Sequence, residues 1–329
     1  MSKDFFDVAY LQVCQKSSKQ KKAIYLGRYP NETRGFQQML SDLKKLGLTP
    51  DSNWFICFEN TGIYSKALLE WLTSKKIACR EENALKIAKS LGIRRGKDDK
   101  IDAKAICHYA FEKRDTIQPS ALPDPDVIKL RKLLSRRELL VRQKRALEVS
   151  FKEQRHALKQ DLLDILQSQN NELIAIYEKQ IGEIESEIEQ VIKNDKKMSG
   201  NNNLAQSVVG IGPIIAANMI AATENFTCFE SSRQFACYSG IAPFPNRSGK
   251  QKGKNSVSHL ANKKIKALLS NAANAAILYD NQIRLYYERK LKEGKQKGIV
   301  INAVKNKLIH RIFAVIKRQK PYVRLGGYA

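Results

Sequence analysis

The first third of the chain alternates short apolar runs with segments in which apolar residues recur at helical spacing. Short apolar runs are typical of buried strands, and the longer repeats are typical of helices. Strands that alternate with helices predict an α/β sandwich with a partly parallel sheet. The predicted strands are Ala23–Leu26, Trp54–Phe58 and Lys76–Cys79, and the predicted helices are Thr33–Leu46, Ile63–Leu72 and Asn83–Leu91.

The middle of the chain is a long helical pattern that follows a proline-containing linker at 118–125. The pattern runs over 126–197, with a basic first half and an acidic second half. These opposite charges favour a helical hairpin, or antiparallel pairing between two chains, with a break near 167–171. A coiled-coil seam is predicted because apolar residues step by four and three at Tyr177, Ile181, Ile184, Ile188 and Val191.

The last third is predicted to be mostly helical, with one loop rich in Gly, Pro and Lys at 240–259. The polar run at 198–203 is predicted to be a linker. These patterns together predict three parts: an N-terminal domain at 1–117, a linker and coiled coil at 118–200, and a C-terminal domain at 201–329.

Charge favours a polyanionic partner. The chain has 58 Lys and Arg against 33 Asp and Glu, a net charge of +25. From Arg247 to Arg324 there are 20 basic residues and only three acids, and this basic block is typical of nucleic-acid binding. No apolar run approaches the length that spans a bilayer, and no signal peptide is visible, so we expect a cytoplasmic protein without a membrane partner. The six cysteines form no CxxC pair and suggest reduced thiols, and four scattered histidines argue against a zinc site.

Three acids in the first region are candidates for metal-dependent chemistry. Glu59 follows a predicted strand, and sites in open α/β folds lie at the carboxyl ends of strands. Asp99 and Asp102 are three residues apart at the start of a predicted helix, which places them on one face. Carboxylates of this kind hold Mg²⁺ in phosphodiester chemistry. The alternative is that these acids, or Asp98, simply cap the helix.

A serine in the basic loop is the candidate nucleophile. Ser248 lies between Arg247 and Lys250 and beside a glycine, and such cations could balance charge at a phosphate that the hydroxyl attacks. The alternative is a basic loop whose serine takes no part in the chemistry.

Other residues suggest contacts to the DNA backbone. Gly210 and Gly212 precede Pro213 at the start of a predicted helix, which resembles a helix-hairpin-helix element with exposed backbone N–H groups. A tight turn that permits close helix packing is an equal alternative. Six lysines are expected to contact phosphates without reading sequence: Lys250, Lys252, Lys254, Lys263, Lys264 and Lys266.

Several motifs occur in a fixed order along the chain. The segment 59–64 has the form E-x-T-G-x-Y, and 97–103 has the form K-x-D-x-x-D-A. In this order and over nearly the whole chain, the motifs resemble those of the DEDD transposases of the IS110 insertion-sequence family, relatives of the Piv-type DNA invertases. The later motifs are Gly210–Pro213, Phe229–Phe235, Tyr238–Pro243 and Arg247–Gly249.

The resemblance implies a RuvC-like (RNase H) N-terminal domain, a coiled coil and a helical C-terminal domain with a nucleophilic serine. Glu59, Asp99 and Asp102 would bind Mg²⁺, and Ser248 would form a transient 5′-phosphoserine with DNA. The family further implies dimers that pair into tetramers. A structured noncoding RNA encoded by the element would guide recombination between element ends and target DNA.

One departure from the family pattern concerns its first catalytic aspartate, which ends a strand of the form G-I-D-x-S-K. Met1 falls just after that position, so we expect that the true start lies upstream and that Met1 is an internal methionine. The alternative is a decayed, inactive copy that still binds DNA and RNA. Asp7 lies on the next strand by resemblance and would not readily replace the aspartate. Further alternatives are an invertase that acts on fixed sites and a junction nuclease that uses only the acids.

Overall fold

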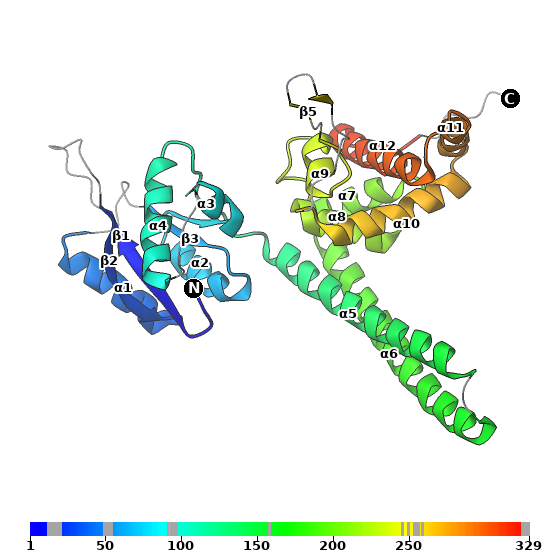
Figure 1. Cartoon of the computed structure of the whole chain (residues 1–329), viewed down its shortest axis with the longest axis horizontal. Coiled ribbons are helices and arrows are strands. Elements are labelled where there is room, and N and C mark those ends of the chain that lie inside the picture. Colours follow the sequence, from blue (N-terminus) through cyan, green and yellow to red (C-terminus); the bar gives the residue numbers. More distant parts are fainter. Residues whose placement is uncertain are drawn as a thin grey trace. The chain divides into compact units, whose positions relative to one another are not determined.

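The computed structural model describes most of the chain and divides it into two compact units, Met1–Leu122 and Pro123–Ala329 (Figure 1). The division falls within the predicted proline-containing linker, where 117–124 has no regular structure. The described residues are 1–11, 22–48, 55–90, 92, 98–156, 159–244, 247–248, 251–252, 257 and 260–323, with only the backbone of 247–248 and 251–252.

The described residues of the first unit form two separate two-stranded ladders and four helices, which confirms the predicted alternation of strands and helices. β1 pairs antiparallel with β2, and β3 pairs parallel with β4. The parallel pair confirms the predicted partly parallel arrangement. The strands are β1 Phe5–Tyr10, β2 Ile24–Pro30, β3 Ile56–Glu59 and β4 Cys79–Glu82, and the helices are α1 Thr33–Lys45, α2 Ile63–Ser74, α3 Ala84–Ser90 and α4 Asp99–Glu112.

The core of this unit is built on aromatic and aliphatic side chains from both ladders. Phe6 of β1 lies 5.7 Å, between ring centroids, from Phe36 of α1, and Phe36 lies 5.6 Å from Trp71 of α2. Phe36 and Leu72 are fully buried. Helix α4 packs against β1 and also against β3, so one helix joins the two ladders.

A helical hairpin begins the second unit. α5 (Pro125–Gln154) packs along α6 (Gln160–Asn194), and ion pairs at 2.6 Å join Arg137 to Glu185 and Lys144 to Glu178 (Figure 1). The basic helix α5 and the acidic helix α6 therefore pair as a hairpin within one chain. The predicted break at 167–171 is wrong, because α6 runs through it, whereas α5 ends at Gln154 and α6 begins at Gln160. Within the predicted seam, Ile188 and Val191 are buried and Ile184 packs against the same core.

The predicted linker at 198–203 is also wrong, because it is part of helix α7. The Asp195 carboxylate caps this helix by accepting from Met198 N at 2.8 Å, and Met198 is 1% exposed. Asn201 is buried and donates to the Asn225 side chain at 2.9 Å. Within this polar run, the buried Asn201 side chain thus finds a partner in a later segment of the same unit.

The remainder of the second unit is helical, as predicted, around an apolar core shared by α7 to α12, and a second core joins α7 and α8 to the hairpin. Two two-residue strands lie within the predicted loop and pair antiparallel, with Ser248 opposite Gln251. The elements are α7 Lys196–Gln206, α8 Pro213–Thr223, α9 Ser232–Tyr238, β5 Arg247–Ser248, β6 Gln251–Lys252, α10 Lys263–Tyr279, α11 Asn281–Lys292 and α12 Lys297–Arg318.

Candidate functional site

Glu59 lies at the last position of β3, where the chain turns into α2. The turn is held by the Asn60 side chain, which accepts from Gly62 N at 2.9 Å, and by the Ser65 hydroxyl, which accepts from Thr61 N at 3.2 Å. Gly62 has φ +72°, a conformation that side chains other than glycine rarely adopt. The sequence E-N-T-G-I-Y thus ends a strand and starts a helix at the predicted carboxyl end of β3.

Asp99 and Asp102 lie in the first turn of α4, as the sequence predicts. The cap of this helix is Asp98, whose side chain accepts from Lys100 N at 3.1 Å. The capping role that the sequence left open therefore falls to Asp98, and the other two carboxylates are available for other contacts.

A single cavity of about 1030 Å³ in the first unit is lined by all three predicted acids, Glu59, Asp99 and Asp102. Its lining includes residues of both β1 and β3. Asp7 of β1 also lines this cavity, so four acids contribute to its wall. The remaining lining is mostly apolar.

An arginine that the sequence did not single out connects two of these acids. The Arg28 guanidinium lies 3.0 Å from a carboxylate oxygen of Asp7 and 3.0 Å from one of Asp99. Asp7 also accepts from the Tyr25 hydroxyl at 2.7 Å, and burial together with this bond raises the pKa of Tyr25 to about 12. Asp7 and Arg28 face each other only because of the β1–β2 register, which is not visible in the sequence.

The carboxylates have the donor chemistry that Mg²⁺ prefers. Among the described residues, however, no three His, Cys, Asp or Glu side chains lie close enough together to hold a metal ion. Arg28 also already neutralises part of the charge of Asp99. As placed, the acids share a cavity without forming a closed magnesium site.

Two thiols line the same cavity. Burial raises the pKa of Cys57 to about 12 and that of Cys107 to about 11, so both remain protonated at neutral pH. A protonated thiol is a weak nucleophile and a weak metal ligand. These two thiols therefore add no charge to the cavity wall beside the acids at neutral pH.

The predicted loop at 240–259, which carries the candidate serine, is held by hydrogen bonds close to both of its ends. Asn302 of α12 donates to Ile241 O at 2.8 Å, and Asn262 donates through its backbone N to Tyr238 O at 2.9 Å. The backbone of Arg247 and Ser248 forms β5, and that of Lys252 belongs to β6. Lys250 and Lys254 lie outside the described residues.

The two candidate glycines before α8 differ in what surrounds them. Gly210 has φ +94°, and a Cβ there would lie 2.5 Å from Ala272 O of α10. Close packing of helices therefore explains this glycine. This is one of the two interpretations that the sequence left open. Gly212 is the N-cap of α8 and has nothing within 4 Å of a Cβ.

The predicted phosphate-binding lysines on α10 also differ. Lys263 is exposed at the first position of α10, whereas Lys264 forms an ion pair with Glu138 at 2.7 Å. Lys266, the fourth residue of the helix, is partly buried. Lys264 therefore has an internal partner, and Lys263 and Lys266 have no carboxylate partner among the described residues.

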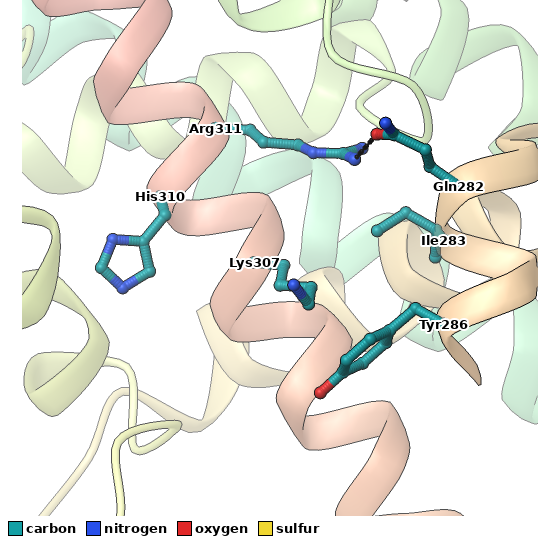
Figure 2. A pocket seen from close by; sticks show the side chains of 6 residues that line it. All are labelled: Gln282, Ile283, Tyr286, Lys307, His310 and Arg311. Atoms are coloured by element: carbon teal, nitrogen blue, oxygen red, sulfur yellow. Dashed lines mark hydrogen bonds between the residues drawn. The ribbon is translucent and has the colours of Figure 1, made fainter. Parts of the chain in front are cut away.

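A second cavity, of about 570 Å³, lies between α11 and α12. Figure 2 shows Arg311 bonded to the Gln282 side chain at 3.0 Å, with His310 pointing away from the other lining residues. Lys307 lies 4.4 Å from the Tyr286 ring centroid, and Arg311 is bonded to Asp280 at 2.6 Å. The cations that line this cavity thus already have partners.

Comparison with known proteins places the chain in one class. Residues 6–167 match a DEDD family model described as Transposase, and residues 202–288 match the model described as Transposase IS116/IS110/IS902 family. These matches cover both compact units. The chain therefore belongs to the IS110 family of transposases.

Individual relatives agree with this assignment. The chain is 28% identical over 278 residues to a pilin gene-inverting protein of Moraxella bovis, with 82% of each chain covered. A pilin gene-inverting protein of Moraxella lacunata gives the same identity and coverage. A probable family 20 transposase of Pseudomonas aeruginosa is 24% identical over 162 residues, which are 48% of this chain and 46% of that protein. Within the described part of this chain, no helix is long and apolar enough to span a membrane.

Proposed function

We propose that this chain is a DNA recombinase of the transposase type, which exchanges strands between the ends of an insertion sequence and a target. The observation that carries the proposal is the cavity shared by Glu59, Asp99 and Asp102, in a chain that belongs to a transposase family. The three acids come from two elements that only the fold brings together. In this proposal the first unit is RuvC-like.

Ser248 is the proposed nucleophile. Its Oγ–P bond forms as the P–O3′ bond of DNA breaks, the leaving 3′-oxygen takes up the proton, and the 5′-phosphate stays on the serine. The 3′-hydroxyl of another strand then attacks the phosphoserine, restores a phosphodiester and returns a proton to Ser248. Each step exchanges one phosphoester for another, so the reaction needs no ATP.

Mg²⁺ is the proposed cofactor, because carboxylates in one cavity are the ligands that this hard cation prefers. Bound there, it would supply positive charge to the reacting phosphate. The basic last quarter of the chain supports DNA as a partner and an element-encoded guide RNA as a second one. Arg247, Lys250, Lys252 and Lys254 would contact phosphates beside the serine. Dimers that pair into tetramers, joined through a coiled coil of α5 and α6, complete the proposal.

A plasmid assay with the gene's own flanking DNA as donor, and RNA transcribed from those flanks, tests the proposal. The parent chain should form a protein–DNA adduct that survives a denaturing gel, and Ser248→Ala should abolish it. Ser256→Ala is the matched control, because Ser256 belongs to the same Gly-, Pro- and Lys-rich segment of the sequence at 240–259. Equal adduct formation by Ser248→Ala and the parent would remove Ser248 from the reaction. Free DNA ends without an adduct would instead indicate a nuclease, and binding without strand exchange an inactive copy.

A site-specific DNA invertase is the second candidate. It is favoured by the match to the pilin gene-inverting protein of Moraxella bovis over 82% of both chains. Its chemistry would be the same, but its products would differ. Two inverted sites on one plasmid should be inverted without insertion elsewhere if the chain is an invertase.

A further inference from the structure

Lys305 is a buried cation that lacks an anionic partner. It lies on α12 with 8% of its surface exposed, and no carboxylate or other acceptor among the described residues contacts its ammonium group. Burial lowers the pKa of Lys305 from its usual value, and the nearby charge of Lys266 lowers it further. Its ammonium group still reaches solvent, because it is not among the described buried atoms that lack a partner, so a mostly buried cation with no protein counter-ion is accessible to an anionic ligand.

The neighbourhood of Lys305 is the first turn of α10. Asn302, one turn earlier on α12, bonds Ile241 at the start of the serine loop, and Asn262 at the end of that loop caps α10 by accepting from Ile265 N at 3.1 Å. Helices α10 and α12 pack against each other (Figure 1). The start of α10, the early part of α12 and both ends of the loop therefore lie together.

The charges at the start of α10 oppose its helix dipole. Lys263, Lys264 and Lys266 lie within its first turn, and no acid lies there. Cations at a helix N-terminus are unfavourable, whereas an anion there is bound by the exposed N–H groups and the dipole. The charge of Lys305 is close enough to that of Lys266 for the two to repel each other, so Lys305 adds a further positive charge near this turn.

We propose that the first turn of α10 and Lys305 together bind one phosphate of a DNA strand, next to both ends of the loop that carries Ser248. Lys266 and Lys305 are positioning residues in this site, because they hold the strand and do not react. The identity of the ligand as DNA rests on the proposed function. The binding site itself rests on the burial of Lys305 and on the charges of α10.

Lys305→Met tests the site, with Lys317→Met as the control. Lys317 lies exposed on the same helix, so both variants lose one charge from α12. We expect Lys305→Met to raise Tm, because a buried unpaired charge is removed, and to weaken binding of a labelled 12-nucleotide DNA about tenfold. The slope of log Kd against log salt should fall by about one. The control should change none of these three quantities to that extent.

A merely structural role for Lys305 predicts the opposite pattern, with a lower Tm and unchanged DNA affinity, and would overturn the proposal. Should Lys305→Met fail to fold, Lys266→Gln, at a partly exposed position, should show the same loss of affinity and salt slope. The affinity for an RNA 12-mer of the same sequence is measured as well. A loss of affinity that is confined to the RNA would overturn the assignment of DNA as the ligand. The binding experiment does not depend on strand exchange. If Ser248→Ala still recombined DNA, that result would refute the proposed function but would not contradict this phosphate site.

Discussion

The Arg28 guanidinium lies 3.0 Å from a carboxylate oxygen of Asp99, across 71 residues of sequence. Through this contact and its bond to Asp7, Arg28 links β2 to both β1 and the start of α4. A cation from the protein thus occupies part of the place where a metal ion is proposed. Arg28 and a divalent cation should compete for the same carboxylates.

We expect Arg28→Met to bind Mn²⁺ about tenfold more tightly than the parent, because removal of an adjacent positive charge favours a cation at Asp99. Titration followed by electron paramagnetic resonance measures the affinity. Lys45→Met, which removes an ion pair with Asp42 on α1, is the control and should not change it. Equal Mn²⁺ affinity in the two variants would show that Arg28 does not compete with the metal.

Glu59→Gln should reduce strand exchange by about 100-fold or more while DNA binding is unchanged, because it removes a charge at the site of chemistry and not from the basic surface. Glu70→Gln, an exposed acid on α2, should retain full activity. Strand exchange is measured on the plasmid substrate and binding by fluorescence anisotropy. A parallel loss of DNA binding would mean that Glu59 acts on the fold instead.

Gly210→Ala should destabilise the second unit by about 2–4 kcal/mol, because the residue has φ +94° and its Cβ would meet Ala272 O at 2.5 Å. Gly212→Ala should cost no more than about 1 kcal/mol, because nothing lies within 4 Å of its Cβ. Calorimetry of the two variants measures the difference. Similar losses would contradict the packing explanation for Gly210.

Cys57 should make the first unit less stable at alkaline pH. Its pKa is raised by burial from 9.0 to about 12, so the unfolded thiol ionises first and the folded state binds more protons between these values. Stability therefore falls as pH rises through this window, by up to about 1.4 kcal/mol per pH unit from this group.

Cys57→Ala should lose less stability than the parent between about pH 9 and 10.5, although it costs about 1 kcal/mol at neutral pH through lost packing. Both tryptophans lie in the first unit, so their fluorescence during urea unfolding reports this unit. Cys237→Ala in the second unit is the control. Parallel pH dependence in Cys57→Ala and the parent would contradict the prediction.

The sequence predicted the helices well where an apolar face repeats, as in α1 with Phe36, Met39 and Leu43. It failed where polar residues find partners far away in the chain. Asn201 is helical and buried because Asn225 accepts its amide, and no local pattern reveals that pairing. The hairpin break was misplaced for a related reason: the polar residues at 167–171 each weaken a helix only slightly, and α6 runs through them.

The amino-acid sequence by itself determined the alternation of strands and helices, the basic last quarter, and the placement of Glu59, Asp99 and Asp102 at a strand end and a helix start. Local periodicity and composition are sufficient for these features. Only the tertiary structure decided that the three acids share one cavity, that Arg28 joins Asp7 to Asp99, and that Lys305 is buried beside Lys266. Those relationships depend on strand register and helix packing between distant segments, which a linear pattern does not encode.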